Sequence, residues 1–316
     1  MSILVIGNVK YERVYELNEN LSKNKNMLAS SHSIHPGGHA LYQSIAASKA
    51  GAEVYISTIL GNDAASLKTT LILNKINCSD IITVDAASGH TVIIKDSDGD
   101  KIICTYDGRK LYLSEDNIRS SLVNHQDNCD YCLIASDMKF SSFAVDEAHT
   151  LRYKIVFSPN FSSDANVPDL SKVDYCIISI DELSRLLGLN NLNQDKNKLK
   201  KYLDEFVSKY RINKLLLVLE NKQGLISYDG LSYTSISIND QFNLIDDTGS
   251  EDCLAAYFTV LISEGKSFEE AASSALLATC LSLSRSGGAV VSPLRAEVNE
   301  KIRELNENNL INIKKI

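Results

Sequence analysis

The chain has 316 residues, of which 44% are hydrophobic and 23% charged, and its formal net charge is −8. This composition is ordinary for a soluble globular protein, and the negative charge argues against nucleic acid or an anionic membrane surface as a partner. The first residues lack the basic stretch and cleavage site of a signal peptide, and no apolar run is long enough for a membrane span, so we expect a cytoplasmic protein.

Short apolar runs rich in branched residues alternate with helical patterns along most of the chain. Such runs are typical of strands buried on both faces, and the alternation predicts an α/β fold with a central, mostly parallel sheet flanked by helices. We expect a single domain over residues 1–316. The predicted strands are residues 3–6, 54–59, 132–135, 155–157, 175–178 and 215–219, and the predicted helices include residues 40–50, 64–73, 182–187, 199–209 and 271–283.

Two segments break this alternation. Residues 10–33 begin as an extension of the first strand and then become polar and rich in Asn and Lys. Residues 90–106 alternate on both sides of Asp96-Ser97-Asp98-Gly99-Asp100, which predicts a hairpin with an Asp-Gly turn. The acidic string is a poor calcium loop, because its glycine is misplaced and Asp107 occupies the position of the closing glutamate.

Seven cysteines, an odd number, lie mostly within apolar segments. Free buried thiols explain this distribution better than disulfides do. Cys129 and Cys132 form a C-x-x-C pair without a second pair or a suitably spaced histidine, so we expect neither a metal nor a redox role there. The cysteines expected to be buried include Cys104, Cys176, Cys253 and Cys280.

A short polar turn, Asp246-Asp247-Thr248-Gly249-Ser250-Glu251-Asp252, precedes an apolar helical run that starts at Cys253. The first N–H groups of such a helix lack internal partners and carry the positive end of its dipole, so they can bind a phosphate group. An aspartate held there could take a proton from an attacking hydroxyl, which indicates phosphoryl transfer. The alternative is an ordinary N-capped helix that happens to start with this sequence.

The spacing of this turn resembles the D-T-x-G-A-G-D signature of the ribokinase-like (PfkB) family of carbohydrate and nucleoside kinases. Asp246, Gly249 and Asp252 match the signature, whereas Ser250 replaces an alanine and Glu251 replaces the second glycine. The resemblance implies that Asp252 is the catalytic base and that Gly249, Ser250 and Glu251 form the anion hole. Glu251 is the largest departure, because it puts a carboxylate where the family keeps this hole bare.

A second motif, Gly37-Gly38-His39-Ala40-Leu41-Tyr42, resembles the Gly-Gly pair that precedes a helix in the same family. Paired glycines let the backbone approach a ligand closely. Leu60-Gly61-Asn62-Asp63 and residues 284–289 are similar to two further family segments, so the resemblance extends over essentially the whole chain. It implies a ribokinase-like fold with a small β-lid, formed by parts of residues 10–34 and 90–110, over the sugar site.

The resemblance places Glu12, Gly37, Gly38, His39 and Tyr42 around the acceptor substrate. Glu12 replaces an aspartate that holds two sugar hydroxyls in the family, and its longer side chain can still accept both protons. His39 has an alternative role as a helix cap, and Tyr42 has one as a core residue.

At the nucleotide end, Ser179-Ile180-Asp181-Glu182 resembles the family's N-x-x-E segment, in which the glutamate, here Glu182, helps to organise Mg²⁺ through water. Asp246 and Thr248 fall where many members arrange a monovalent-cation site, which makes K⁺ a candidate activator. The nucleotide-binding residues that the resemblance implies are Ser179, Asn221, Gly224 and Gly288.

Together these features predict an ATP- and Mg²⁺-dependent kinase that phosphorylates a hydroxyl of a sugar, sugar derivative or nucleoside, and that dimerises through its lid. A second hypothesis is a catalytically weakened binding or regulatory protein on the same fold. No Walker-type phosphate loop is present and no G-x-G-x-x-G follows the first strand, which argues against a P-loop enzyme and an NAD-binding dehydrogenase. The departures that motivate the second hypothesis are Glu12, Tyr42, Ser179, Glu220 and Glu251.

Overall fold

The computed structural model describes residues 1–106, 112–135, 139–159, 167–189, 192, 196–220, 222–287 and 291–316. Within them, a sheet of eleven strands has the order β15-β14-β13-β12-β11-β10-β9-β1-β4-β5, with β6 also paired to β4. The neighbouring strands from β12 to β5, and β6 beside β4, are parallel. These strands are β1 (Ser2–Ile6), β4 (Glu53–Gly61), β5 (Ile76–Asn77), β6 (Ile81–Val84), β9 (Tyr131–Ala135), β10 (Lys154–Ser158), β11 (Tyr175–Ser179) and β12 (Leu215–Val218).

All six predicted strands are present in this parallel region, so the predicted α/β class is confirmed. Their side chains alternate between two cores: Ile3 and Val5 of β1 belong to one core, and Leu4 and Ile6 to the other. All four are at most 1% exposed. A strand buried on both faces reads as a continuous apolar run, which is why these segments could be recognised from the sequence.

Three antiparallel strands extend the sheet beyond β12. They are β13 (Gly224–Tyr228), β14 (Tyr233–Ile238) and β15 (Ile311–Lys315), and the last of them brings the C-terminal residues to the edge of the sheet.

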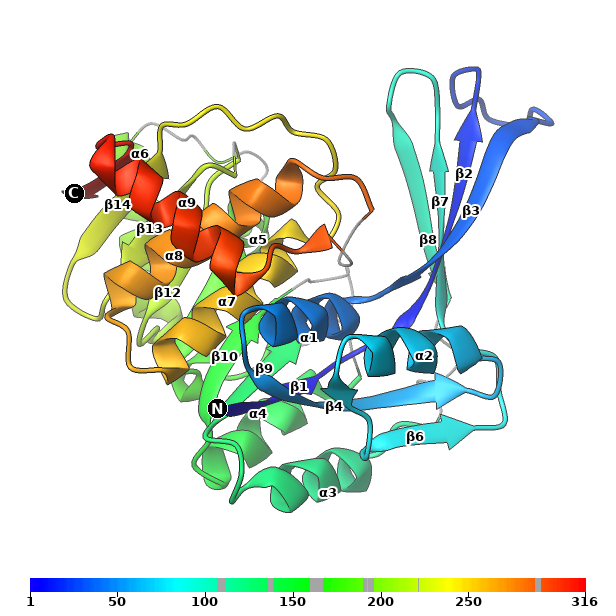
Figure 1. Cartoon of the computed structure of the whole chain (residues 1–316), viewed down its shortest axis with the longest axis horizontal. Coiled ribbons are helices and arrows are strands. Elements are labelled where there is room, and N and C mark those ends of the chain that lie inside the picture. The colour runs from blue at the N-terminus through cyan, green and yellow to red at the C-terminus, as the bar shows by residue number, and fades with distance from the viewer. Residues whose placement is uncertain are drawn as a thin grey trace.

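Helices cover both faces of the sheet (Figure 1). One layer packs on the core that contains Ile3, and the other on the core that contains Leu4. The predicted helices are confirmed, with ends that differ by a few residues. The first layer comprises α1 (His39–Lys49), α2 (Ala65–Leu73), α7 (Ser250–Ser263), α8 (Phe268–Leu283) and α9 (Arg295–Glu307), and the second comprises α3 (Glu115–His125), α4 (Ser141–Thr150), α5 (Ile180–Leu187) and α6 (Lys196–Tyr210), with a short 3₁₀ turn at Leu170–Lys172.

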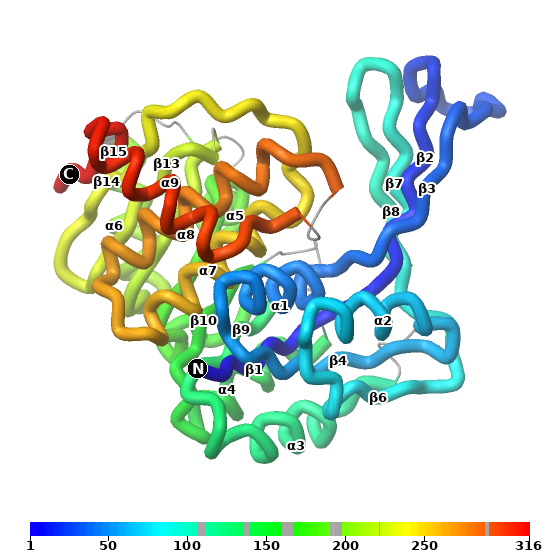
Figure 2. Tube along the Cα trace, in the orientation of Figure 1, coloured from blue at the N-terminus to red at the C-terminus, as the bar shows by residue number. Residues whose placement is uncertain are grey.

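A second sheet of four strands, in the order β3-β2-β7-β8, projects from the body (Figures 1 and 2). The predicted hairpin is present, and the Asp96 carboxylate stabilises its turn by accepting the N–H groups of Asp98 (3.0 Å) and Asp100 (2.9 Å). The sheet combines two segments that are far apart in the sequence, and both belong to the parts expected to form a lid. Its strands are β2 (Lys10–Leu17), β3 (Ala29–Gly37), β7 (His90–Lys95) and β8 (Lys101–Tyr106).

The cysteines are free thiols, and Cys176, Cys253 and Cys280 are buried as expected. The expectation was wrong for Cys104, which is exposed on β8 because this strand lies at the edge of the small sheet rather than in the core. Within the described part of the chain, no helix combines the length and apolar character that crossing a membrane requires.

Candidate active site

The amino ends of α1 and α7 lie side by side and carry the candidate catalytic residues. Both helices begin after a glycine with positive φ, Gly38 (φ 101°) and Gly249 (φ 72°), and neither N-cap residue makes a side-chain capping hydrogen bond. The N-cap of α7 is therefore a glycine, which leaves the start of the helix without a side-chain cap. Uncapped helix ends of this kind bind anions.

Asp252 is the third residue of α7 and is 4% exposed. Its Oδ1 atom accepts a hydrogen bond from Gln43 Nε2 at 3.0 Å. His39 Nδ1 lies 3.1 Å from Oδ1 and 3.0 Å from Oδ2, so with its proton on Nδ1 the ring also donates to the carboxylate. Two side chains of α1 thus fix the orientation of the candidate base.

Both N-cap glycines are required by close contacts as well as by their backbone angles. A Cβ atom on Gly249 would lie 3.0 Å from the ring of Tyr42, and one on Gly38 would lie 2.4 Å from the carbonyl oxygen of Asn8. Both glycines therefore bring the backbone close to neighbouring groups of the protein, whereas the expected close approach to a ligand stays a prediction.

The expected anion hole comprises Gly249, Ser250 and Glu251, at the first turn of α7. The N–H group of Ser250 already donates to the carbonyl of Asp247 at 3.2 Å. Glu251 has an ordinary helical backbone and is absent from the non-glycine residues with positive φ among those described, so replacing the family's glycine does not strain the chain here. Glu251 can therefore affect the anion hole through the charge of its side chain and not through its backbone geometry.

The Glu251 side chain is only partly exposed, and burial raises the pKa of its carboxyl group. The positive charge of Lys222 acts against this rise, whereas the charge of Asp252 adds to it. Lys222 Nζ lies 3.3 Å from Ser250 Oγ and 3.5 Å from Asp247 Oδ2, and so occupies the amino end of α7. Motif reasoning missed Lys222, because it belongs to the turn between β12 and β13 and reaches α7 only through the fold.

Glu182 forms a capping box with Ser179 at the start of α5. Glu182 Oε2 accepts hydrogen bonds from the N–H (2.8 Å) and hydroxyl (3.0 Å) of Ser179, whose Oγ accepts the N–H of Glu182. The pKa of Glu182 is raised to about 7, mainly by burial and also by the charge of Glu251, while the bonds from Ser179 act against the rise. The charge of Glu251 thus acts on Glu182, while the hydrogen bonds of Glu182 within the described residues tie it to its own helix cap.

The acceptor-side residues meet where the small sheet joins the body. The Tyr42 hydroxyl donates to Glu12 Oε2 at 2.8 Å, and Tyr42 is only 6% exposed. Burial and the neighbouring Glu12 both raise the pKa of Tyr42. A Cβ on Gly37 would lie 2.5 Å from the Glu12 carboxyl, so Gly37 makes room for this side chain. Tyr42 is thus a core residue that also positions the carboxylate expected to bind substrate.

Asp246 holds together the loop that precedes α7. Its oxygens accept the N–H groups of Thr248 (3.0 Å) and Gly287 (3.4 Å). Partial burial raises the pKa of Asp246, but these hydrogen bonds lower it by more, and the net shift is downward. These contacts give Asp246 a structural role at the position where the K⁺ site was expected.

Of the four expected nucleotide-binding residues, Asn221 and Gly288 lie outside the described residues. Gly224 is buried at the start of β13, where its carbonyl accepts the N–H of Leu219 at 3.0 Å and closes a turn. A pocket of about 200 Å³ adjoins this turn and the loop before α7. It is lined by Phe242, Leu244 and Leu283 on an apolar side, and by Glu220, Lys222, Gln223 and Asp247 on a polar side.

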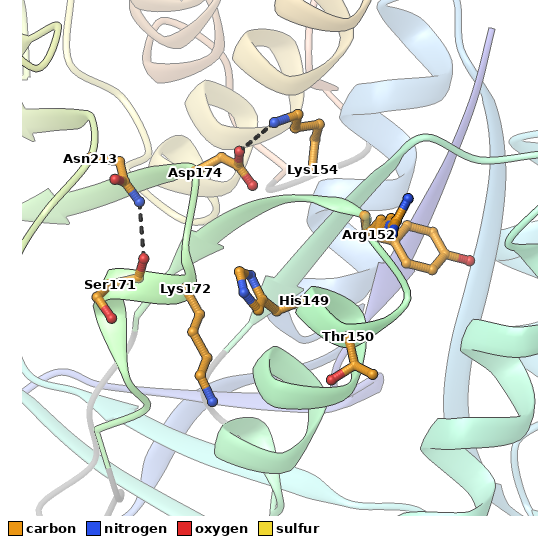
Figure 3. Close-up of a pocket in the computed structure, with 9 residues that line it drawn as sticks. His149, Thr150, Arg152, Lys154, Ser171, Lys172, Asp174 and Asn213 are labelled. Carbon is orange, nitrogen blue, oxygen red and sulfur yellow. Dashed lines mark hydrogen bonds and ion pairs between the residues drawn. The ribbon is translucent and has the colours of Figure 1, made fainter.

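A larger cavity of about 490 Å³ lies at the opposite, amino end of the parallel strands (Figure 3). Its two lysines already have carboxylate partners, since Lys154 bonds Asp174 (2.9 Å) and Lys172 bonds Asp146 (2.7 Å). Ligands of open α/β sheets bind outside the carboxyl ends of the strands. The smaller pocket, which adjoins Asp247 and the start of α7, is therefore the better candidate for the nucleotide.

The segment Leu60-Gly61-Asn62-Asp63 has a structural role. A Cβ on Gly61 would lie 2.3 Å from backbone atoms of residues 86 and 88, and the Asp63 carboxylate accepts the N–H of Ser88 at 2.8 Å. These contacts fix the end of β4 to the segment that leads into the small sheet.

Direct contacts join five of the residues singled out by sequence. His39 contacts Asp252, Gly249 packs on Tyr42, and Tyr42 bonds Glu12. An anion at the start of α7 would have a buried carboxylate beside it, which is the arrangement that transfer of a phosphoryl group to a hydroxyl requires.

Known proteins resemble this chain over nearly its whole length. The profile of the pfkB family carbohydrate kinases matches residues 1–295. A ribokinase of Dictyostelium discoideum is 25% identical over 283 residues, covering 83% of this chain and 88% of that protein. The structure of a ribokinase from Giardia lamblia has a TM-score of 0.84 at 18% identity and covers 96% of this chain and 99% of its own. An Arabidopsis thaliana ribokinase complexed with ribose and ATP has a TM-score of 0.78 at 20% identity, with coverages of 94% and 97%.

Proposed function

This chain belongs to the pfkB family of carbohydrate kinases, which makes it a phosphotransferase, and we propose that it transfers the γ-phosphoryl group of ATP to a hydroxyl of a sugar, sugar derivative or nucleoside. The observation that carries the proposal is the position of Asp252. It is a buried carboxylate, oriented by His39 and Gln43, at the uncapped amino end of α7. A general base must lie beside both the attacking hydroxyl and the phosphoryl group, and a carboxylate at the start of α7 would lie beside a phosphoryl group bound there.

In the proposed reaction, Asp252 takes the proton of the acceptor hydroxyl as its oxygen attacks the γ-phosphorus. The bond from the γ-phosphorus to the bridging oxygen breaks, and ADP leaves with that oxygen. Backbone N–H groups at the start of α7, in the segment Gly249-Ser250-Glu251, stabilise the charge on the equatorial oxygens. To take part, the N–H group of Ser250 would give up its 3.2 Å bond to the Asp247 carbonyl.

The acceptor is proposed to bind between Asp252 and Glu12. The Glu12 carboxylate can accept two hydroxyl protons, and the bond from Tyr42 holds it in place. Gly37, Gly38 and His39 line the same region at the start of α1. The ribose in the Arabidopsis structure supports a sugar or a sugar-containing acceptor, and the departures at Glu12 and Tyr42 favour an acceptor other than plain ribose.

The nucleotide is proposed to occupy the pocket between Leu244 and Lys222, with its phosphates directed to α7. Mg²⁺ neutralises charge on the phosphates of bound ATP, and proteins hold it through one or two carboxylates and water. Glu182 fits this role, because a carboxyl group whose pKa is raised by burial and by a nearby carboxylate gains from a cation close to it. A monovalent-cation role for Asp246 and Thr248 is proposed from the family resemblance alone.

The small sheet is proposed to act as a lid that excludes water from the site, and also as a dimer interface. Lys101 of β8 lies 3.9 Å from Asp247, so the hairpin already reaches the loop before α7. Exclusion of water matters in a kinase, because water competes with the acceptor for the phosphoryl group. We also propose a cytoplasmic location, which the acidic, soluble composition supports.

The second hypothesis, a catalytically weakened binding protein, has one specific observation in its favour. Glu251 places a partly buried carboxyl group next to the anion hole. A negative charge about 4 Å from a phosphoryl oxygen would cost several kcal/mol in a partly dry site. The energetic cost of this negative charge falls if a nearby cation compensates for the charge.

The test is an assay of ADP release from ATP with Mg²⁺ and K⁺ against a panel of sugars, sugar acids, polyols and nucleosides. The kinase proposal predicts release that depends on one class of acceptor. Acceptor binding by calorimetry without ADP release would support the binding protein, and omission of K⁺ would test the monovalent-cation role separately.

A further inference from the structure

Lys222 places an ammonium group at the amino end of α7, next to the one residue of the anion hole that departs most from the family pattern. We infer that Lys222 binds the phosphate chain of the nucleotide and offsets the negative charge of Glu251, which keeps the altered anion hole functional. The inference rests on the proposed kinase function. It names Lys222 as the group whose positive charge lets a phosphate bind beside the carboxylate of Glu251.

The backbone of Lys222 is fixed in a way that aims the side chain at α7. The residue has φ 52°, an uncommon conformation for a residue with a Cβ. Its N–H donates to the carbonyl of Leu219 at 2.8 Å, and its own carbonyl accepts a weak bond from Cys280 Sγ at 3.8 Å. The side chain then reaches Ser250 Oγ at 3.3 Å and remains 24% exposed. Because Ser250 is the first residue of α7, the ammonium group stands beside the place where a phosphate would bind the helix end.

The charges around Lys222 are arranged for an anion. An ammonium group beside a helix N-terminus is unfavourable by itself, since both carry positive charge. Asp247, at 3.5 Å, is its ion-pair partner among the described residues, but half of the Asp247 side chain is exposed (51%), and such pairs contribute little. A phosphate group would satisfy the helix end and Lys222 together. The Lys222 charge also opposes the rise in the pKa of Glu251, so the two groups are electrostatically coupled.

The pocket beside Lys222 has the composition that a nucleotide needs. Phe242, Leu244 and Leu283 form an apolar wall suited to a heterocyclic base, and Lys222 stands on the polar side. A base bound against this wall would have its phosphate chain directed past Lys222 to the start of α7. This arrangement predicts that Lys222 recognises the phosphates and not the base or the ribose.

Calorimetric binding of ATP, ADP and adenosine to the 316-residue chain tests the inference without requiring turnover. Lys222→Met should weaken ATP binding by roughly tenfold to a hundredfold, the range for a hydrogen bond to a charged group, and change adenosine binding less than about twofold. Lys222→Arg should retain most of the ATP affinity. Lys301→Met is the matched control, because Lys301 is 25% exposed and pairs with Asp240 on another part of the surface.

Loss of ATP and adenosine affinity by the same factor, or of neither, would overturn the assignment of Lys222 to the phosphates. The offset of charge is tested by Glu251→Gln in the Lys222→Met background, which should restore part of the lost ATP affinity. Strictly additive effects of the two changes would contradict the coupling. If the wild-type protein turns over an acceptor while Lys222→Met binds ATP normally, this inference fails and the kinase proposal stands. A wild-type protein that binds ATP no more tightly than adenosine and shows no turnover would overturn both.

Discussion

The carboxyl groups around the helix ends differ in what surrounds them. Asp252 accepts hydrogen bonds from side chains of α1, whereas Glu182, among the described residues, bonds its own helix cap and is buried near Glu251. A base that is held by donors stays oriented toward the acceptor. A carboxyl group whose pKa is raised by burial is instead stabilised in its ionised form when a cation binds close to it. Environment, and not residue type, thus separates the proposed roles.

Glu182 should make the stability of the ligand-free protein depend on pH. Its pKa is 4.5 without perturbation and about 7 in the folded chain, so the folded state retains a proton that the unfolded state releases in this interval. Stability is therefore lost as the pH rises from about 4.5 through 7, by up to about 3 kcal/mol. Urea unfolding without Mg²⁺ should show that Glu182→Gln is more stabilising, relative to wild type, at pH 8 than at pH 5.

Glu300→Gln, on the exposed side of α9, serves as the control and should show no such difference between the two pH values. An equal effect of Glu182→Gln at pH 5 and pH 8 would show that the buried carboxyl group is not protonated in the folded state.

Motifs identified the chemical groups of the site but not their partners. Asp252 was evident from its turn, whereas its partners His39 and Gln43 are 213 and 209 residues away in the sequence. Such contacts arise only when α1 and α7 pack together. The sequence did not indicate a role for Lys222 in the site, because a lone lysine in a turn is ordinarily a solvated surface residue. Cys104 was misjudged because an apolar strand segment can lie at an exposed edge.

Among the elements, the start of α7 depends on Gly249, which has a positive φ and lies close to the ring of Tyr42. Gly249→Ala would strain the backbone and press a Cβ against the Tyr42 ring, 3.0 Å away. We expect a loss of about 2–3 kcal/mol, of which the conformational strain accounts for about 1 kcal/mol. Thermal unfolding of Gly249→Ala and Gly265→Ala separates the contribution of backbone strain from that of the contact with Tyr42.

Gly265 is the suitable comparison because it also has a positive φ (83°), but a Cβ added there would have no atom within 4 Å. Equal destabilisation by the two substitutions would show that contact with Tyr42 does not restrict the start of α7.

The elements that could be predicted were those whose burial or capping leaves a clear pattern in the sequence. The parallel strands are buried on both faces and read as apolar runs, and α8 has a capping box, Ser267 to Glu270, that marks its start. The antiparallel strands β13–β15 fell outside the prediction. β14, for example, alternates Ser and Ile at residues 235–238, and β15, at the edge of the sheet, is polar or exposed at most positions, so neither has the continuous apolar run of the parallel strands.

At the scale of the whole molecule, the small sheet leaves an apolar face uncovered. The pairing register places Glu12 opposite Thr91 and His35, so Ile34 and Ile102 point to the face away from Glu12. Ile34, Ile102 and Tyr106 are 49%, 53% and 54% exposed. An apolar sheet face with an exposed edge strand favours pairing with another copy, which supports the proposed homodimer.

Ile102→Lys should therefore convert a dimer of 34.8 kDa chains into monomers, as measured by light scattering during size-exclusion chromatography. A charge at the centre of an apolar interface is costly to bury. Leu231→Lys, at a surface turn where the leucine is 93% exposed, is the control and should remain dimeric. A wild-type protein that is monomeric at all concentrations, or an Ile102→Lys variant that stays dimeric, would argue against pairing through this face.

The most direct test of the account compares acceptor-dependent ADP release by the wild-type protein and by Asp252→Asn. Asparagine keeps the size of the side chain but removes the basic oxygen, so the rate should fall by roughly a thousandfold while nucleotide and acceptor affinities change little. That result would establish Asp252 as the base of a sugar or nucleoside kinase. Turnover that is unchanged in Asp252→Asn would contradict the proposed mechanism.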